Sequence, residues 1–249
     1  QWINKKPKQH LRALGIKKHV HIDIFQCWDV LDAEVLHLRM APNALAVYKS
    51  APEFICISYE SPVSKPVPWS DAAAFQAVVS KLKTTDVLHL GNSSIVRYFN
   101  YFPKAVQLYG NRGVAGIDGS LSTAVGAALA DPDRKHFLII GDQSFLYDHN
   151  GLYGQKIPQN LIICVLNNGV GGIFDWLPGT ASTGPTAQRV FANAQHVNLK
   201  GIASAFSVGY QAVSSVEALV EALDTAVGPK IIDSKTEQHA NLAALAALR

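Results

Sequence analysis

The chain has 249 residues, 48% of them hydrophobic and 16% charged, which is the composition of a globular protein that can bury a full core. Its net charge of +3 comes from 22 Lys and Arg against 19 Asp and Glu, and so small a surplus argues against nucleic-acid binding. No apolar run is long enough to span a membrane and the N-terminus has no apolar signal core, so a cytoplasmic protein is expected. Cys27, Cys56 and Cys164 lack metal-ligand spacing and are expected to be reduced core residues.

Two short β-prone runs lie in the N-terminal quarter, at 19–24 and 54–59, among helix-compatible segments. They predict that residues 1–62 are the C-terminal part of a central α/β domain. Three prolines between Ser61 and Pro68 favour an extended linker, placed at residues 63–70, and residues 71–249 are expected to form the main domain. Because the basic start at Gln1 runs directly into a strand, the chain reads as a piece of a longer protein.

Six apolar runs follow, at 86–90, 105–109, 136–140, 161–166, 208–213 and 230–233, and they alternate with helical or glycine-rich segments. This alternation predicts an α/β fold, with a parallel six-stranded sheet flanked by helices and preceded by a remnant of a second α/β domain. Ligands of such sheets bind outside the carboxyl ends of the strands. Functional residues are therefore expected directly after the apolar runs.

Two of these runs are followed by groups suited to a metal-bound phosphate. Gly141, Asp142 and Ser144 follow one run, ahead of a helix predicted from about Phe145 to Gln155, and Asn168 follows the next run. One helix and one parallel strand separate Asp142 from Asn168, so both side chains are expected at the same edge of the sheet. Mg²⁺ prefers one or two carboxylates together with neutral and phosphate oxygens, which this pair would allow.

Either motif alone is more often a plain turn or loop, and it is the pair that favours a metal site. Gly-Asp-x-Ser, followed after about two dozen residues by Asn-Asn, resembles the signature of thiamine-diphosphate enzymes. The resemblance implies a thiamine diphosphate cofactor held through Mg²⁺ or Mn²⁺. It assigns Gly141, Asp142, Ser144 and Asn168 to cofactor binding, and Asp142, Asn168 and the backbone carbonyl of Val170 to the metal.

Three further stretches, Gly91 to Arg97, Asn111 to Gly119 and Gly172 to Pro178, resemble one family of these enzymes. It is the family of 2-succinyl-5-enolpyruvyl-6-hydroxy-3-cyclohexene-1-carboxylate synthases of menaquinone biosynthesis, and the stretch from Asn111 to Gly119 is the most discriminating. The resemblance implies a transferase that decarboxylates 2-oxoglutarate and adds the resulting succinyl-semialdehyde carbanion to isochorismate.

Both of these substrates are dianions, and a guanidinium matches the two oxygens of a carboxylate. The resemblance assigns Arg97 and Arg112 to substrate binding and catalysis, Ser93 to a neighbouring substrate contact, and Ile117 to bending the cofactor for catalysis. It assigns further substrate contacts to Lys5, Ile173, Phe174 and Leu177. Other interpretations stay open: solvent exposure for the arginines, core packing for the apolar residues and a solvated basic face for Lys5.

Small residues from Ser120 to Ala130 predict a helix packed closely against the sheet or a second subunit. The resemblance implies a homodimer or a dimer of dimers, with the cofactor between subunits. It also places the glutamate that activates the cofactor in an N-terminal pyrimidine-binding domain, which no part of this chain resembles. These residues alone are therefore expected to bind the diphosphate weakly and not to turn over.

Two other functions remain open. Another thiamine-diphosphate decarboxylase or carboligase of 2-oxo acids would keep the metal site and change the substrate. A non-catalytic phosphate-binding module is the second, although the chain has no Gly-x-x-x-x-Gly-Lys loop, and Gly113, Gly116 and Gly119 do not have dinucleotide-binding spacing.

Overall fold

The computed structural model describes residues 45–49, 54–58, 67–154 and 156–248, and the chain divides into two compact units, Gln1–Glu60 and Ser61–Arg249. In the first unit, β1 (Leu45–Lys49) and β2 (Phe54–Ser58) pair as antiparallel strands. β2 matches the predicted strand at 54–59, whereas the strand predicted at 19–24, Lys5 and the first half of the predicted linker lie outside the described residues. Within the described part, no helix is long and apolar enough to cross a membrane.

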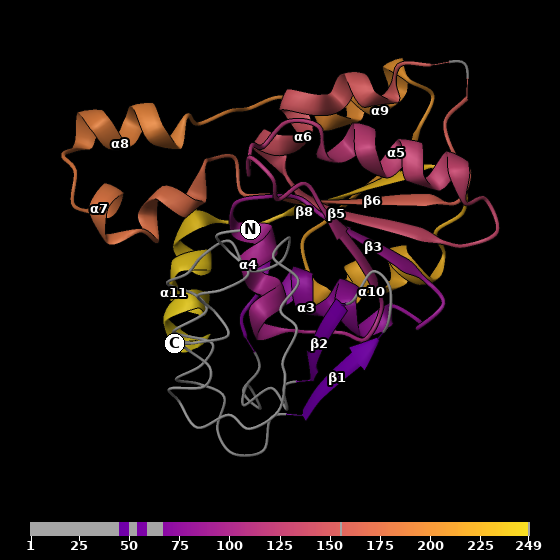
Figure 1. Cartoon of the computed structure of the whole chain (residues 1–249). Helices are drawn as coiled ribbons and strands as arrows, with labels where there is room; N and C mark the ends of the chain where they lie inside the picture. The colour runs from indigo at the N-terminus through magenta and orange to yellow at the C-terminus, as the bar shows by residue number, and fades with distance from the viewer. Residues whose placement is uncertain (1–44, 50–53, 59–66, 155, 249) are drawn as a thin grey trace. The chain divides into compact units, whose positions relative to one another are not determined.

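The second unit is built on a six-stranded sheet in which every pair of neighbours is parallel, in the order β4-β3-β5-β6-β8-β7 (Figure 1). This confirms the predicted fold class, and each strand begins and ends within two residues of a predicted run. In chain order the strands are β3 (Val87–Leu90), β4 (Gln107–Gly110), β5 (His136–Gly141), β6 (Leu161–Asn167), β7 (Gly209–Val213) and β8 (Lys230–Lys235).

Two layers of helices cover the sheet, and Figure 1 shows them on opposite faces. One layer contains α3 (Asp71–Lys81), α4 (Ser94–Tyr101), α10 (Val216–Asp224) and α11 (Gln238–Leu248). The other contains α5 (Ser120–Ala130), α6 (Asp142–Asp148) and α9 (Leu199–Ala205). After β6, the short helices η2 (Gly172–Asp175), α7 (Pro178–Ala181) and α8 (Pro185–Ala192) lead away from the sheet, and α7 and α8 project to one side of the layers.

Successive residues of a strand enter different cores. Phe137 and Ile139 of β5 pack in the core under α3, whereas Leu138 and Ile140 pack in the core under α5. A strand covered on both faces needs apolar residues at every position, which is why the central strands are continuous apolar runs in the sequence. The carboxyl ends of all six strands consequently lie along one edge of the sheet.

The helix predicted from about Phe145 to Gln155 is wrong in its bounds. α6 begins at Asp142, directly after β5, and ends at Asp148, where a 3-10 turn, η1 (His149–Leu152), replaces it. The cause is contact with α5: a Cβ on Gly151 would lie 2.7 Å from Oγ of Ser122. The Asp148 carboxylate also accepts a hydrogen bond from the Ser122 N–H group, at 2.8 Å. Close packing on α5 therefore ends the helix early.

Candidate active site

Asp142 lies at the carboxyl end of β5 and is 3% exposed. Its carboxyl group accepts hydrogen bonds from the backbone N–H groups of Gln143 and Gly169 and from Nε2 of Gln195, which is 2.6 Å away. Burial raises the pKa of Asp142 to about 6, the hydrogen bonds oppose this rise, and the nearby carboxyl group of Asp71 adds to it. A cation bound here would offset the cost of burying the negative charge.

Asn168 follows β6, the strand next to β5. Its Oδ1 accepts a hydrogen bond from the Val170 N–H group at 3.0 Å, and its Nδ2 donates to Oδ2 of Asp71 at 2.9 Å. The carbonyl oxygen of Val170 accepts a hydrogen bond from the Gly172 N–H group at 2.9 Å. Asp142, Asn168 and Val170 thus bring one carboxylate and two neutral oxygens to adjacent strand ends, a set that fits Mg²⁺ and leaves ligand positions for phosphate and water.

A segment after α8 packs across the loop that contains these groups. The Gly171 N–H group donates to the carbonyl of Ala192 at 2.6 Å, and the Gln195 N–H group donates to the carbonyl of Gly169 at 2.8 Å. Gly169 has a φ of 76°, and a Cβ on Gly171 would lie 3.2 Å from the carbonyl oxygens of Phe191 and Ala192. Glycine at these two positions therefore permits the close approach.

Ser144 connects the metal-binding loop with the segment from Asn111 to Gly119. Its hydroxyl is buried and donates to the carbonyl of Ile117 at 2.5 Å, so it holds the half-buried Ile117 beside α6. Gly141, the residue before Asp142, has an extended backbone with φ −75° and ψ 154°. The direct contact of Ser144 and Gly141 with a cofactor stays a prediction.

Asn92 holds Arg112 at the carboxyl end of β3. Asn92 is 1% exposed, and its Oδ1 accepts a hydrogen bond from Nη1 of Arg112 at 2.6 Å. The Nδ2 of Asn92 donates to the carbonyl oxygens of Asn111, at 2.8 Å, and Gly116. Arg112 is itself buried, so the alternative of a solvated loop arginine does not hold.

Arg97 is held by the residue next to Asn92. Its Nη1 donates to the carbonyl of Ser93 at 2.8 Å, one turn back along α4. Ser93 has a φ of 71°, which is unusual for a residue other than glycine and is typical of functional sites. Adjacent residues of one strand end therefore anchor both of the arginines that were predicted to bind substrate.

The three apolar residues predicted to line the substrate pocket differ in exposure. Ile173 is 9% exposed and belongs mainly to the core, whereas Leu177 is 39% exposed. The ring of Phe174 is half-buried and lies 5.6 Å from the ring of Phe191 on α8. Phe174 and Leu177 are thus more accessible to a ligand than Ile173.

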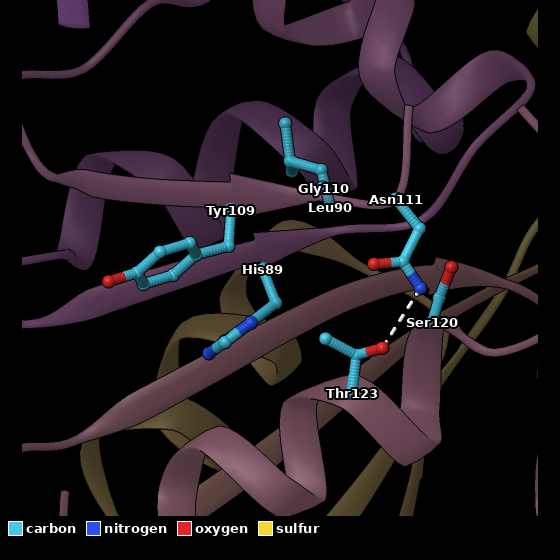
Figure 2. Close-up of a pocket in the computed structure, with 7 residues that line it drawn as sticks. All are labelled: His89, Leu90, Tyr109, Gly110, Asn111, Ser120 and Thr123. Carbon is cyan, nitrogen blue, oxygen red and sulfur yellow. Dashed lines mark hydrogen bonds between the residues drawn. The ribbon is translucent and has the colours of Figure 1, made fainter. Parts of the chain in front are cut away.

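A small pocket lies between the ends of β3 and β4 and the first turn of α5 (Figure 2). Inside it, Nδ2 of Asn111 donates to Oγ1 of Thr123 and to the carbonyl of Gly119, both at 2.9 Å, which fastens the segment containing Arg112 to α5. Burial lowers the pKa of His89 to about 4, so its ring is neutral at physiological pH. Since its lining groups are neutral, this pocket does not suit a dianion; they are His89, Leu90, Tyr109, Gly110, Asn111, Ser120 and Thr123.

Four polar residues of the site were not predicted, namely Asn92, Asp71, Gln195 and Thr236. Thr236 follows β8, so the rule that drew attention to Asp142 could have found it. Asp71 has the pattern of an ordinary first-turn helix residue, although burial raises its pKa and hydrogen bonds from Thr236, Asn168 and Asn241 oppose that rise. Nothing in the sequence marks Gln195, which is 53 residues from Asp142.

Residues 90–234 match the family model described as "Thiamine pyrophosphate enzyme, C-terminal TPP binding domain", thiamine pyrophosphate being another name for thiamine diphosphate. Proteins named 2-succinyl-5-enolpyruvyl-6-hydroxy-3-cyclohexene-1-carboxylate synthase are similar to the chain. The one from Flavobacterium psychrophilum is 33% identical over 92% of the chain and 44% of the relative. The one from Bacteroides thetaiotaomicron is 33% identical over 93% of the chain and 43% of the relative. The chain therefore spans less than half the length of these relatives.

The fold is also found in a solved structure from Mycobacterium smegmatis that is described as a thiamin diphosphate-dependent enzyme. It superposes with a TM-score of 0.56 at 21% sequence identity, covering 72% of this chain and 34% of that one. The relatives confirm the resemblance that was seen in the sequence. On these grounds the chain belongs to the thiamine pyrophosphate enzymes and contains their C-terminal, cofactor-binding domain.

Proposed function

We propose that this chain is the part of a 2-succinyl-5-enolpyruvyl-6-hydroxy-3-cyclohexene-1-carboxylate synthase that holds the diphosphate of thiamine diphosphate. The whole protein would decarboxylate 2-oxoglutarate and join the remaining unit to isochorismate, a step of menaquinone biosynthesis. The name carried by the relatives and the groups gathered at the strand ends support this assignment.

The metal is Mg²⁺ or Mn²⁺, bound by the carboxylate of Asp142, Oδ1 of Asn168 and the carbonyl oxygen of Val170. Gly141 and Ser144 lie beside this set and contact the diphosphate. The donors are hard oxygens with a single carboxylate, as Mg²⁺ prefers when phosphate supplies its remaining ligands. Bound thiamine diphosphate supplies a nucleophilic thiazolium carbon and a sink for the electrons left when carbon dioxide departs.

The observation that carries the substrate assignment is the anchoring of two guanidinium groups by adjacent residues. Asn92 holds Arg112 and the carbonyl of Ser93 holds Arg97, and both contacts lie at the end of β3, beside β5. Fixing a guanidinium at one nitrogen orients its plane, so that it can meet a carboxylate in a bidentate contact. Two such groups suit substrates that each carry two negative charges.

The apolar residues have complementary roles. Ile117 lies beside α6 and shapes the bound cofactor, while Ile173, Phe174 and Leu177 keep water from the reacting carboxylate. Loss of carbon dioxide removes a charge, so a site with little water favours it.

The proposal extends to the rest of the protein on the strength of the family resemblance. It includes a cytoplasmic homodimer or dimer of dimers, a substrate contact from Lys5, and the division into residues 1–62, 63–70 and 71–249.

Kinetics on the whole protein, supplied with thiamine diphosphate and Mg²⁺, test the proposal. Release of carbon dioxide from 2-oxoglutarate, coupled to consumption of isochorismate, is the expected result. If pyruvate is decarboxylated in preference to 2-oxoglutarate, the protein is a different thiamine-diphosphate carboligase or decarboxylase. If no 2-oxo acid is decarboxylated and phosphate compounds bind equally well, a phosphate-binding module replaces the enzyme.

A further inference from the structure

Asp71 is a buried carboxylate beside the proposed metal ligands. It is the first residue of α3, where an acidic side chain usually faces solvent and stabilises the helix start, yet it is 3% exposed. Its Oδ1 accepts a hydrogen bond from Oγ1 of Thr236 at 2.5 Å, and its backbone N–H group donates to Oδ1 of Asn241 at 2.7 Å. Its remaining oxygen, Oδ2, accepts a hydrogen bond from Nδ2 of Asn168 at 2.9 Å.

These contacts determine which way the amide of Asn168 points. An ionised carboxylate can only accept, so the group facing Asp71 must be the NH₂ group of Asn168. The backbone N–H group of Val170 can only donate, so the group that faces it, at 3.0 Å, must be the oxygen. Rotating the amide by half a turn would oppose two acceptors at Asp71 and two donors at Val170.

The orientation matters because Mg²⁺ is bound by oxygen, and the NH₂ group of an amide has no lone pair to offer it. An amide oxygen has two acceptor positions, and Val170 uses one of them. With the NH₂ group of Asn168 held by Asp71, the other acceptor position of its oxygen is left for a metal.

We propose that Asp71 is a positioning residue of the metal site, which presents the oxygen of Asn168, rather than its nitrogen, to the cation. Thr236 and Asn241 hold Asp71 in place from the end of β8 and from α11. Because the inference takes Asn168 as a metal ligand, it rests on the proposed function. Residues that orient the ligands of a metal in this way typically contribute about 10-fold to 100-fold to its affinity.

Two substitutions separate orientation from charge. Asp71→Ala removes the acceptor for Asn168 and is expected to weaken Mg²⁺ binding about 10-fold to 100-fold. Asp71→Asn removes the charge but keeps an oxygen for Asn168, and its NH₂ group can donate to the hydroxyl of Thr236, which accepts as well as donates. It is therefore expected to retain most of the Mg²⁺ affinity.

The readout is the dissociation constant of Mg²⁺, measured by calorimetry on the whole protein with saturating thiamine diphosphate, which requires no catalysis. Asp86→Ala is the matched control, because Asp86 is 7% exposed and its carboxylate accepts a hydrogen bond from the Lys83 N–H group at 2.7 Å. This control should lower the free energy of unfolding and leave the Mg²⁺ affinity unchanged.

Thr236→Val covers the case in which Asp71→Ala does not fold. It preserves volume but releases one oxygen of Asp71, so a loss of about 3-fold or more in Mg²⁺ affinity is expected. Unchanged affinity in Asp71→Ala, or in Thr236→Val if Asp71→Ala is unfolded, overturns the inference. Equal losses in Asp71→Ala and Asp71→Asn also overturn it, since charge would then be the cause. If the unmodified protein shows no Mg²⁺-dependent binding of thiamine diphosphate, the proposed function fails as well.

Discussion

Replacing Asp142 by Asn is expected to stabilise the metal-free protein at neutral pH while it abolishes metal binding. In the folded chain, burial raises the pKa of Asp142 from 3.8 to about 6. A carboxyl group with a raised pKa contributes stability that is complete below pH 3.8 and is lost as the pH rises through about 6. A neutral amide has no such loss, and so the benefit appears above about pH 6.

The magnitude follows from the same pKa values. Each unit of difference between the folded and unfolded pKa corresponds to about 1.4 kcal/mol, so ionised Asp142 costs the metal-free fold about 3 kcal/mol at neutral pH. The substituted amide opposes one of the donors that now face the carboxylate, Gly169 or Gln195, which offsets about 1 to 2 kcal/mol of the gain. The expected net increase in the free energy of unfolding is about 1 to 2 kcal/mol.

Urea denaturation of the metal-free protein at about pH 4 and about pH 8 measures this effect. Asp142→Asn should be the more stable protein at the higher pH only. Asp148→Asn is the matched control, since Asp148 is buried but accepts two hydrogen bonds from Ser122, and it should lose stability at about pH 8. Adding Mg²⁺ with thiamine diphosphate should stabilise the unmodified protein and not Asp142→Asn. If Asp142→Asn is no more stable than the unmodified protein at about pH 8, the reasoning about burial is refuted.

Three further outcomes are expected. Gln195→Ala removes a hydrogen bond that lowers the pKa of Asp142, so the midpoint of the pH dependence of Mg²⁺ binding should move to higher pH in calorimetry, and an unmoved midpoint would contradict this. Arg112→Lys should lower kcat/KM for both substrates about 10-fold or more, because an ammonium cannot make a bidentate contact. Arg134→Lys, at the opposite end of the sheet, is its control in steady-state assays, and equal effects would argue against the role of Arg112. Ile117→Ala should lower kcat while the dissociation constant of thiamine diphosphate changes less than about 3-fold, and the reverse pattern would make Ile117 a simple binding residue.

The sheet could be predicted from the sequence because strands buried on both faces are apolar at every position. The run at 161–166 became β6, Leu161–Asn167, and the run at 136–140 became β5, His136–Gly141. The helix after β5 was misplaced because its end depends on Gly151 packing against α5, a contact that no local pattern reveals.

The same distinction applies to the candidate site. Asp142 and Asn168 follow strands, so their nearness at one edge of the sheet follows from topology alone. Asp71 could not be found in this way, because its partner Asn168 is 97 residues away. The metal-binding and substrate-binding roles of these residues stay predictions, whereas their positions at adjacent strand ends are properties of the fold.

The central claim is that the ends of β5 and β6 hold a diphosphate through a divalent cation. Calorimetric titration of the whole protein with thiamine diphosphate, in Mg²⁺ and then with the metal chelated, tests it most directly. We predict binding that requires the metal, that is lost in Asn168→Ala, and that NAD and ATP do not reproduce. Equal binding of thiamine diphosphate after chelation, or preferential binding of either nucleotide, would contradict the claim.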